Sequence, residues 1–190
     1  MRKICLFAIF VFYQPVCSGS NYIIDTDGAH ASINFKINHR GFSLLTGRFN
    51  NFSGRFFYNA EKQESTWVSV EIDMSSVDTN HPTRDSFLKS AAVLNAESYK
   101  KAVFTGDNYT SLSDSEGVLS GILSLNGVSK KIEIKAKKIG EGADMWGGYR
   151  VGFSGETSIR LKDYGILYDF GEASKYVEME IHIEGIKSNL

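Results

Sequence analysis

The chain has few residues that cross-link or stiffen a protein: two cysteines and two prolines among 190 residues. Both cysteines, Cys5 and Cys17, lie within the first 20 residues. A mature chain without that segment contains no thiol, which excludes a disulfide framework, a thiolate metal site and a cysteine nucleophile. The packing of apolar side chains must therefore hold the fold together.

The chain also lacks an excess of charge of either sign, with 21 Lys and Arg against 22 Asp and Glu. Without residues 1–20, which contain Arg2 and Lys3, 19 basic residues remain against 22 acidic ones, a formal charge of −3. This balance leaves no basic surface for nucleic acid. It also argues against electrostatic docking on an anionic membrane but leaves contact with a neutral one open.

The first 20 residues have the pattern of a secretory signal peptide. Two basic residues precede an uncharged apolar run at residues 4–13, and small residues follow it. The run is roughly ten residues long, whereas a membrane-spanning helix needs about twenty. We therefore predict a leader at residues 1–20, cleaved after Ser18 or Ser20, and one domain at residues 21–190, located in the periplasm or secreted.

Beyond the leader, apolar and polar residues alternate with period two, which is typical of strands that bury one face. Residues 149–161 and 176–186 show this most clearly, with one apolar face and one polar or charged face. The same pattern, less regular, predicts strands at residues 31–38, 66–74 and 102–105, and one long bent strand with a bulge at residues 44–58.

Asn126-Gly127 lies between two apolar runs and predicts a two-residue type I′ hairpin turn. Such a turn determines which residues face each other across the two strands. The predicted pairs are Leu125 with Val128, Leu123 with Lys130, Gly121 with Ile132 and Leu119 with Ile134.

One helix is predicted from about residue 80 to 94, with Pro82 in its first turn. Arg84 precedes Phe87 and Leu88 by one helical turn, so its stem extends their apolar face. Arg84-Asp85 has two interpretations: a polar pair that anchors a ligand head group, or a first-turn Asp with a capping salt bridge. The spacing alone favours the second.

About eight strands with one inserted helix predict an all-β fold with a closed or nearly closed antiparallel sheet. The interior of such a barrel is either filled by its own side chains or admits one slender ligand. The strand pattern does not choose between these alternatives.

Titratable side chains do not converge in the predicted fold. His182 lies on the acidic outer face of its strand, His81 in the turn before the helix, and His30 and His39 have opposite strand parity. Motifs for a serine nucleophile, a zinc protease and a phosphate-binding loop are missing. We therefore expect no catalytic residue, no metal site and no enzymatic activity.

Several motifs along the chain occur together in one known family. They are Ala29-His30-Ala31-Ser32-Ile33-Asn34-Phe35, Gly47-Arg48-Phe49 through Phe52-Ser53-Gly54, Arg84-Asp85 with Leu88, Leu125-Asn126-Gly127-Val128, Trp146-Gly147-Gly148 with Val151-Gly152-Phe153, and Leu161-Lys162-Asp163-Tyr164-Gly165. On these residues, the region from Tyr22 to Lys187 resembles the YceI-like polyisoprenoid-binding family of exported lipocalin-like barrels.

The resemblance implies an eight-stranded antiparallel lipocalin-like β-barrel with one inserted helix, in the periplasm or secreted. It also implies a lipid inside the barrel, such as a polyprenyl compound, a quinone tail or a fatty acyl chain, and no other cofactor. The sequence departs from the family pattern at Asn95 and at Lys100-Lys101, in the connection from the helix to the next strand.

The expected partner is a long apolar lipid, and not nucleic acid; transient contact with a membrane or membrane proteins and a homodimer stay open. The alternatives are a secreted structural or partner-binding β protein with a filled core and, ranked last, an enzyme that acts on a lipid. The residues expected to contact the lipid are Phe35, Ile37, Phe49, Phe87, Leu88, Phe104, Trp146 and Phe153 along its chain, with Arg84 and His39 near a polar head.

Overall fold

A computed structural model describes residues 19–188 of the chain. The predicted leader lies outside the described residues, apart from residues 19 and 20. The described part contains four short 3-10 turns, the helix α1 (Pro82–Lys89) and the strands β1 (Ser20–Ile24), β2 (Ser32–His39), β3 (Ser43–Phe49), β4 (Phe52–Tyr58), β5 (Trp67–Asp73), β6 (Val77–Asp78), β7 (Lys101–Ser111), β8 (Glu116–Leu125), β9 (Val128–Ala143), β10 (Tyr149–Arg160) and β11 (Tyr176–Ser188).

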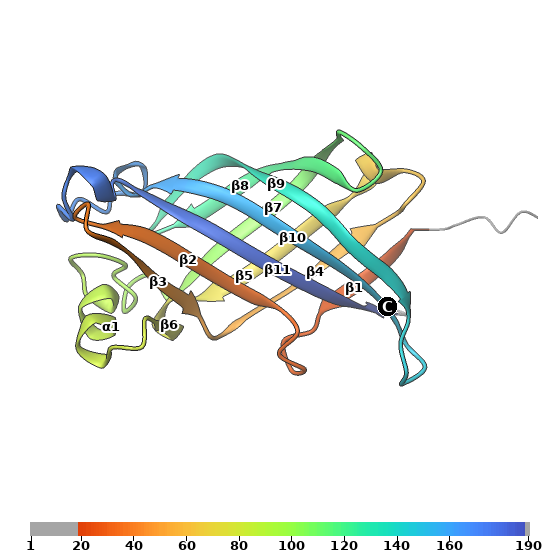
Figure 1. Cartoon of the computed structure of the whole chain (residues 1–190), viewed down its shortest axis with the longest axis horizontal. Helices are drawn as coiled ribbons and strands as arrows, with labels where there is room; N and C mark the ends of the chain where they lie inside the picture. Colours follow the sequence, from red (N-terminus) through yellow and green to blue (C-terminus); the bar gives the residue numbers. More distant parts are fainter. Residues whose placement is uncertain (1–18, 189–190) are drawn as a thin grey trace, which may run out of the picture.

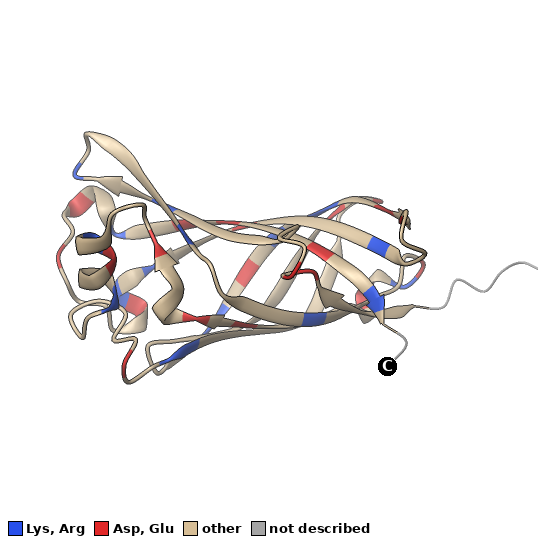
Figure 2. Cartoon of the chain, turned by 90° about the horizontal axis from the view of Figure 1, so that it is seen from below, with Lys and Arg blue, Asp and Glu red and all other residues tan. Residues whose placement is uncertain are grey.

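Eight of these strands close into an antiparallel barrel in the order β1, β4, β5, β7, β8, β9, β10, β11, and β1 pairs back to β11. The barrel is elongated, and α1 lies at one end of it (Figure 1). The prediction of an eight-stranded antiparallel barrel with one helix is thus confirmed. Charged residues of both signs are distributed along its whole length (Figure 2).

The strands β2, β3 and β6 extend the wall at the end that carries α1. Residues Val177 to His182 of β11 pair with β2, whereas residues Gly185 to Ser188 pair with β1. The strands β1 and β2 therefore follow one another along the same edge of β11. The wall of the barrel is therefore longer at this end than the eight closing strands alone would make it.

The single bent strand predicted at residues 44–58 is wrong, because the chain breaks there into β3 and β4. At the break, Asn50 N donates to Ser76 O in the turn after β5 at 3.1 Å, and Asp73 N, of the last residue of β5, donates to Asn51 O at 2.9 Å. After the break, β4 pairs with β1 and β5, whereas β3 pairs with β2 and β6.

The hairpin between β8 and β9 has the predicted turn and register. Asn126 and Gly127 have φ angles of 51° and 77°, as a type I′ turn requires. All four predicted residue pairs occur in the β8–β9 ladder. The alternation predicted for β10 and β11 also holds, since their apolar residues face the interior.

The helix begins where the sequence predicts but ends earlier, at Lys89 and not near residue 94. Ser90 leaves the helical conformation, and its hydroxyl donates to Phe87 O at 2.7 Å. The chain then turns back, and Asn95 adopts a φ of 46°, a conformation that asparagine tolerates better than most residues. The departure from the family pattern at Asn95 thus coincides with a left-handed turn position.

Candidate functional site: the barrel cavity

A cavity of about 460 Å³ runs through the interior of the barrel. Protein pockets that hold one small ligand typically measure about 300 to 1,000 Å³, so this cavity has room for one slender molecule. The barrel interior is therefore not completely filled by its own side chains.

Strand geometry accounts for the apolar lining, because every second residue of each strand points inward. From β5 these are Val68, Val70 and Ile72; from β11 they are Val177, Met179, Ile181 and Ile183. In β10 one of the inward positions is Gly155, which pairs with Ile181 and lies against Ile134 of β9, where a Cβ atom would come within 2.9 Å of the isoleucine side chain.

Nine of the ten residues predicted to contact a lipid line this cavity. They come from β2, β3, α1, β7 and β10, so the fold brings together residues from five elements. Their contact with a ligand stays a prediction. The nine are Phe35, Ile37, His39, Phe49, Arg84, Phe87, Leu88, Phe104 and Phe153.

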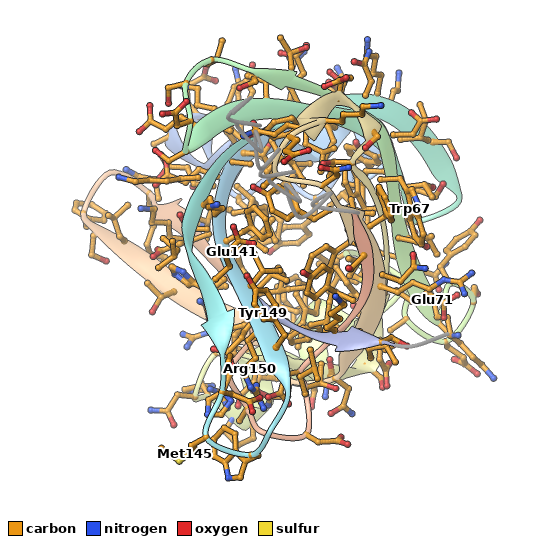
Figure 3. All side chains as sticks on the ribbon, turned by 90° about the vertical axis from the view of Figure 1, so that its right-hand side faces the viewer. Trp67, Glu71, Glu141, Met145, Tyr149 and Arg150 are labelled. Carbon is orange, nitrogen blue, oxygen red and sulfur yellow. The ribbon has the colours of Figure 1, made fainter. Side chains whose placement is uncertain are left out.

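Trp146 does not line the cavity, so its predicted place in the interior is wrong. It lies in the turn between β9 and β10 and is 69% exposed, with the guanidinium of Arg150 5.0 Å from its ring centroid. The adjacent Met145 lies at the tip of this hairpin, away from the barrel wall (Figure 3). The turn directs both side chains outward, because the Asp144 carboxylate accepts hydrogen bonds from the backbone at Trp146 and Gly148.

Arg84 lies at the α1 end of the cavity and is fixed by the buried Thr79. Its Nε donates to Thr79 Oγ1 and its Nη2 to Thr79 O, both at 2.7 Å. The Asp85 carboxylate accepts from Thr79 N at 2.9 Å and from Thr79 Oγ1 at 2.5 Å. Arg84 and Asp85 thus hold the same threonine from two sides, and Arg84 also faces the cavity.

The same end has an apolar rim, formed by the tip of the β2–β3 hairpin and the loop after β10. Phe42 is 85% exposed, Leu44 64% and Leu167 73%. Next to them, Tyr168 stacks edge-on against Phe87 with ring centroids 4.9 Å apart, and both of these rings line the cavity. Exposed apolar side chains therefore surround the α1 end of the cavity.

At the opposite end, the lining includes three polar side chains from neighbouring strands: Tyr58 of β4, Thr66 just before β5, and Tyr109 of β7. Burial raises the pKa of the Tyr109 phenol, and the proximity of Tyr58 adds to this effect. Thr66 Oγ1 is buried and has no hydrogen-bond partner among residues 19–188. Sequence analysis did not identify this cluster, because each residue alone has the pattern of an ordinary strand end.

A charged cluster that the sequence analysis missed lies on the barrel wall and outside the cavity. Arg150 Nη1 lies 2.5 Å from Asp25 and 2.6 Å from Glu184, and its Nε lies 2.8 Å from Asp144. The hydrogen bond from Arg150 lowers the pKa of the Asp25 carboxyl from 3.8 to about 2. Asp25 and Arg150 are 125 residues apart in the sequence, so no local pattern indicates that they form a pair.

Asp25, His30 and Glu184 also place potential metal-ligating atoms within 4.8 Å of one another. The Arg150 guanidinium, however, bonds to both carboxylates and supplies the positive charge that a cation would bring. The geometry is therefore that of a structural ion pair network that ties the end of β1 to β10 and β11.

The profile of the YceI-like domain matches residues 22–185, nearly the whole described chain. The chain belongs to the YceI-like family. This YceI-like protein is 43% identical over 182 residues to a UPF0312 protein of Shewanella sp. strain W3-18-1, covering 96% of this chain and 95% of the relative. It is 45% identical over 170 residues to a UPF0312 protein of Shewanella baltica strain OS155, covering 90% and 89%.

Solved structures share the barrel of this YceI-like protein. Burkholderia cenocepacia BcnA has a TM-score of 0.75 at 16% identity, covering 85% of this chain and 98% of BcnA. The Campylobacter jejuni YCEI protein has a TM-score of 0.73 at 25% identity, covering 81% and 91%. A polyisoprenoid binding domain from Saccharophagus degradans has a TM-score of 0.62 at 17% identity, covering 88% and 98%.

Proposed function

We propose that this YceI-like protein binds one long apolar lipid inside its barrel, of the polyisoprenoid, quinone-tail or fatty acyl type. The observation that carries the proposal is the cavity of about 460 Å³, which is lined almost throughout by aliphatic and aromatic side chains. The protein would act as a carrier or buffer for such a lipid, and no further cofactor is part of the proposal.

The physical chemistry of the lining supports this ligand class. Each methylene group moved from water into an apolar interior contributes about 0.8 kcal/mol, so a few isoprene units offset the entropy lost on binding. One methylene more or less changes the affinity by only about 1–3 kcal/mol. The cavity would therefore accept several chain types, and the description of the Saccharophagus degradans neighbour makes a polyprenol a rational first probe.

We propose that the protein binds the lipid and does not catalyse a reaction on it. The polar side chains at the two ends of the cavity come from different elements and are separated by an apolar middle, which suits the binding of an amphipathic chain. The alternative, a structural or partner-binding β protein without a ligand, requires a filled core, and the cavity counts against it. Export to the periplasm or the medium is proposed from the leader pattern alone.

We also propose that the apolar rim at the α1 end contacts a neutral membrane surface when lipid is loaded. Phe42, Leu44 and Leu167 are exposed beside cavity-lining residues, so a lipid could pass from the bilayer into the barrel without crossing water. Among the described residues, none belongs to a helix with the length and hydropathy needed to cross a membrane.

Organic extraction of the purified protein followed by mass spectrometry tests the central proposal. A lipid that co-purifies in a fixed ratio, and that rebinds after removal, is the expected result. Protein that is repeatedly recovered empty, and that binds neither prenols nor fatty acids, would favour the ligand-free alternative.

A further inference from the structure

The polar cluster at the end opposite α1 consists of Tyr58, Thr66 and Tyr109. The ladders place them together. Phe57 pairs with Trp67, next to Tyr58 and Thr66, and Val68 pairs with Gly106, three residues before Tyr109. All three line the cavity. The cluster is therefore a polar wall of an otherwise apolar chamber, contributed by three adjacent strands.

The Thr66 hydroxyl differs from the other two, because its oxygen is buried and the described part of the chain offers it no hydrogen-bond partner. A buried hydroxyl in an apolar environment costs free energy unless it is paired, and most such groups in proteins are paired. The oxygen belongs to a residue that lines the cavity, where a guest molecule could supply the missing partner.

Three other polar side chains in the cavity lining, Thr157, Ser174 and Arg84, already have partners. Thr157 Oγ1 donates to Glu133 O at 2.7 Å, and Ser174 Oγ donates to Asn38 O at 2.5 Å. Arg84 is held by Thr79 at the α1 end. The Thr66 hydroxyl differs from these three groups, and it indicates where a polar group of a ligand could bind in the cavity.

The local packing makes room for a polar group at this place. Tyr109 lies against Gly117 of β8, where a Cβ atom would overlap the phenol oxygen, so glycine allows the ring to take its position. The charged side chains of the cavity lining, Arg40 and Arg84, belong to the α1 end. Lys138 lies beside Tyr58, with its Nζ 5.6 Å from the ring centroid, but it does not line the cavity and pairs with Glu141 at 2.9 Å. The lining at the Thr66 end therefore presents hydroxyl groups to the interior, which suits a neutral ligand group better than an anion.

We propose that Tyr58, Thr66 and Tyr109 form a subsite that hydrogen-bonds a neutral oxygen-bearing group of the lipid, such as a hydroxyl, ketone or amide oxygen. The lipid then lies with this polar group at the end away from α1 and its apolar chain toward the α1 rim. This inference rests on the proposed lipid-binding function and adds the orientation and the head-group chemistry.

The test compares Thr66→Val with the control Thr157→Val, which makes the same change at a cavity hydroxyl that already has a partner. The probes are geranylgeraniol and phytane, a C20 isoprenoid alcohol and a hydrocarbon of the same skeleton. Their dissociation constants are measured on delipidated protein by displacement of cis-parinaric acid. Thr66→Val should weaken geranylgeraniol binding about five- to tenfold and leave phytane binding unchanged.

The control variant should leave the ratio of the two dissociation constants as in the wild type. A second variant, Tyr109→Phe, should also weaken binding of the alcohol selectively. Thr66→Val should raise the Tm of the lipid-free protein, because a methyl group replaces an unpaired buried hydroxyl. This measurement confirms that the variant is folded.

Four other outcomes would contradict the subsite. Unchanged affinity of Thr66→Val for geranylgeraniol would overturn the subsite, as would equal loss for both probes or an equal effect of Thr157→Val. In these cases the wild type still binds the hydrocarbon, and the lipid-binding function stands. If the wild type bound neither probe, lipid binding itself would fail and the subsite with it.

Discussion

Arg150 joins three segments that are far apart in the chain, through Asp25 after β1, Asp144 in the β9–β10 turn and Glu184 in β11. Asp25 is buried, so its charge needs this partner. Removal of one member of such a network leaves an uncompensated charge, which is generally more destabilising than replacement of the whole network.

The lowered pKa of Asp25 predicts how stability depends on pH. Because its pKa of about 2 in the folded protein lies below the ordinary value of 3.8, the carboxylate stabilises the fold above pH 4, and this contribution is lost as the pH falls toward 2. Asp25→Asn should lower the Tm at pH 7 and make its decline between pH 4 and 2 shallower. Thermal unfolding at several pH values measures both effects.

The affinity for lipid at pH 7 is the control for this variant, since the ion pair network lies outside the cavity and the affinity should not change. A Tm profile for Asp25→Asn that runs parallel to the wild-type profile below pH 4 would contradict the assignment.

The turn glycine Gly127 carries a second prediction. Its φ is 77°, and a Cβ atom there would come within 2.6 Å of the Tyr99 ring. Gly127→Ala should therefore be destabilised both by the left-handed backbone and by the displaced ring, by about 2 kcal/mol or more. Gly41→Ala is the matched control: its φ is 86°, but a Cβ meets nothing within 4 Å, so only the backbone cost of about 1 kcal/mol applies. Urea unfolding measures both values, and equal losses would contradict the role of Tyr99.

At the scale of elements, the parts of the fold that local pattern controls were predictable. The register of β8 and β9 follows from the Asn126-Gly127 turn, and the apolar faces of β10 and β11 follow from strict alternation. The helix end was not predictable, because Ser90 ends it through a hydrogen bond to Phe87, although Leu94 continues the helical spacing. The break between β3 and β4 depends on bonds to Asp73 and Ser76, which a local pattern does not reveal.

The same distinction applies to the site. Phe35, Ile37 and Phe153 line the cavity because strand parity turns them inward, and parity can be read from the sequence. Trp146 was predicted to face the interior because it belongs to the Trp146-Gly147-Gly148 motif. It lies in a turn, however, where the alternation of inward and outward side chains does not apply. The unpaired oxygen of Thr66 depends on what surrounds it in three dimensions, so no sequence signal marks it.

The β2–β3 hairpin carries a prediction of its own, because its tip exposes Phe42 and Leu44 beside the cavity. If this rim contacts the membrane, replacing both residues with Ser should slow lipid transfer from phosphatidylcholine vesicles about tenfold or more. The equilibrium affinity for the lipid in solution should not change, since neither side chain lines the cavity. Stopped-flow fluorescence with a labelled lipid measures the transfer rate.

The matched control lies in the β9–β10 hairpin, whose turn is at the end of the barrel away from α1 (Figure 1). Ile139→Ser with Met145→Ser removes two exposed apolar side chains from this hairpin. It should transfer lipid at the wild-type rate. An equal decrease in both double variants would indicate a general effect of surface hydrophobicity and would contradict a specific role of the rim.

At the scale of the whole molecule, the barrel contains a cavity where a smaller barrel would have a fully packed core. The described strands bury two apolar clusters, and Met179 and Ile181 contact both of them. A bound lipid would complete this interior, so the protein should be more stable with its ligand than without it. At a ligand concentration of 100 times the Kd, linkage predicts a gain of about 2.7 kcal/mol.

Filling the interior with a side chain should therefore replace the lipid. Ile181 of β11 lines the cavity, so Ile181→Trp places an indole in the cavity. We expect lipid affinity to fall at least about tenfold, while the Tm of the lipid-free protein stays equal or rises. The control Ile122→Trp makes the same change on the exposed face of β8 and should bind lipid as the wild type does. Lipid titration and thermal unfolding of both variants measure these effects, and full binding by Ile181→Trp would mean that the lipid occupies a place other than the barrel interior.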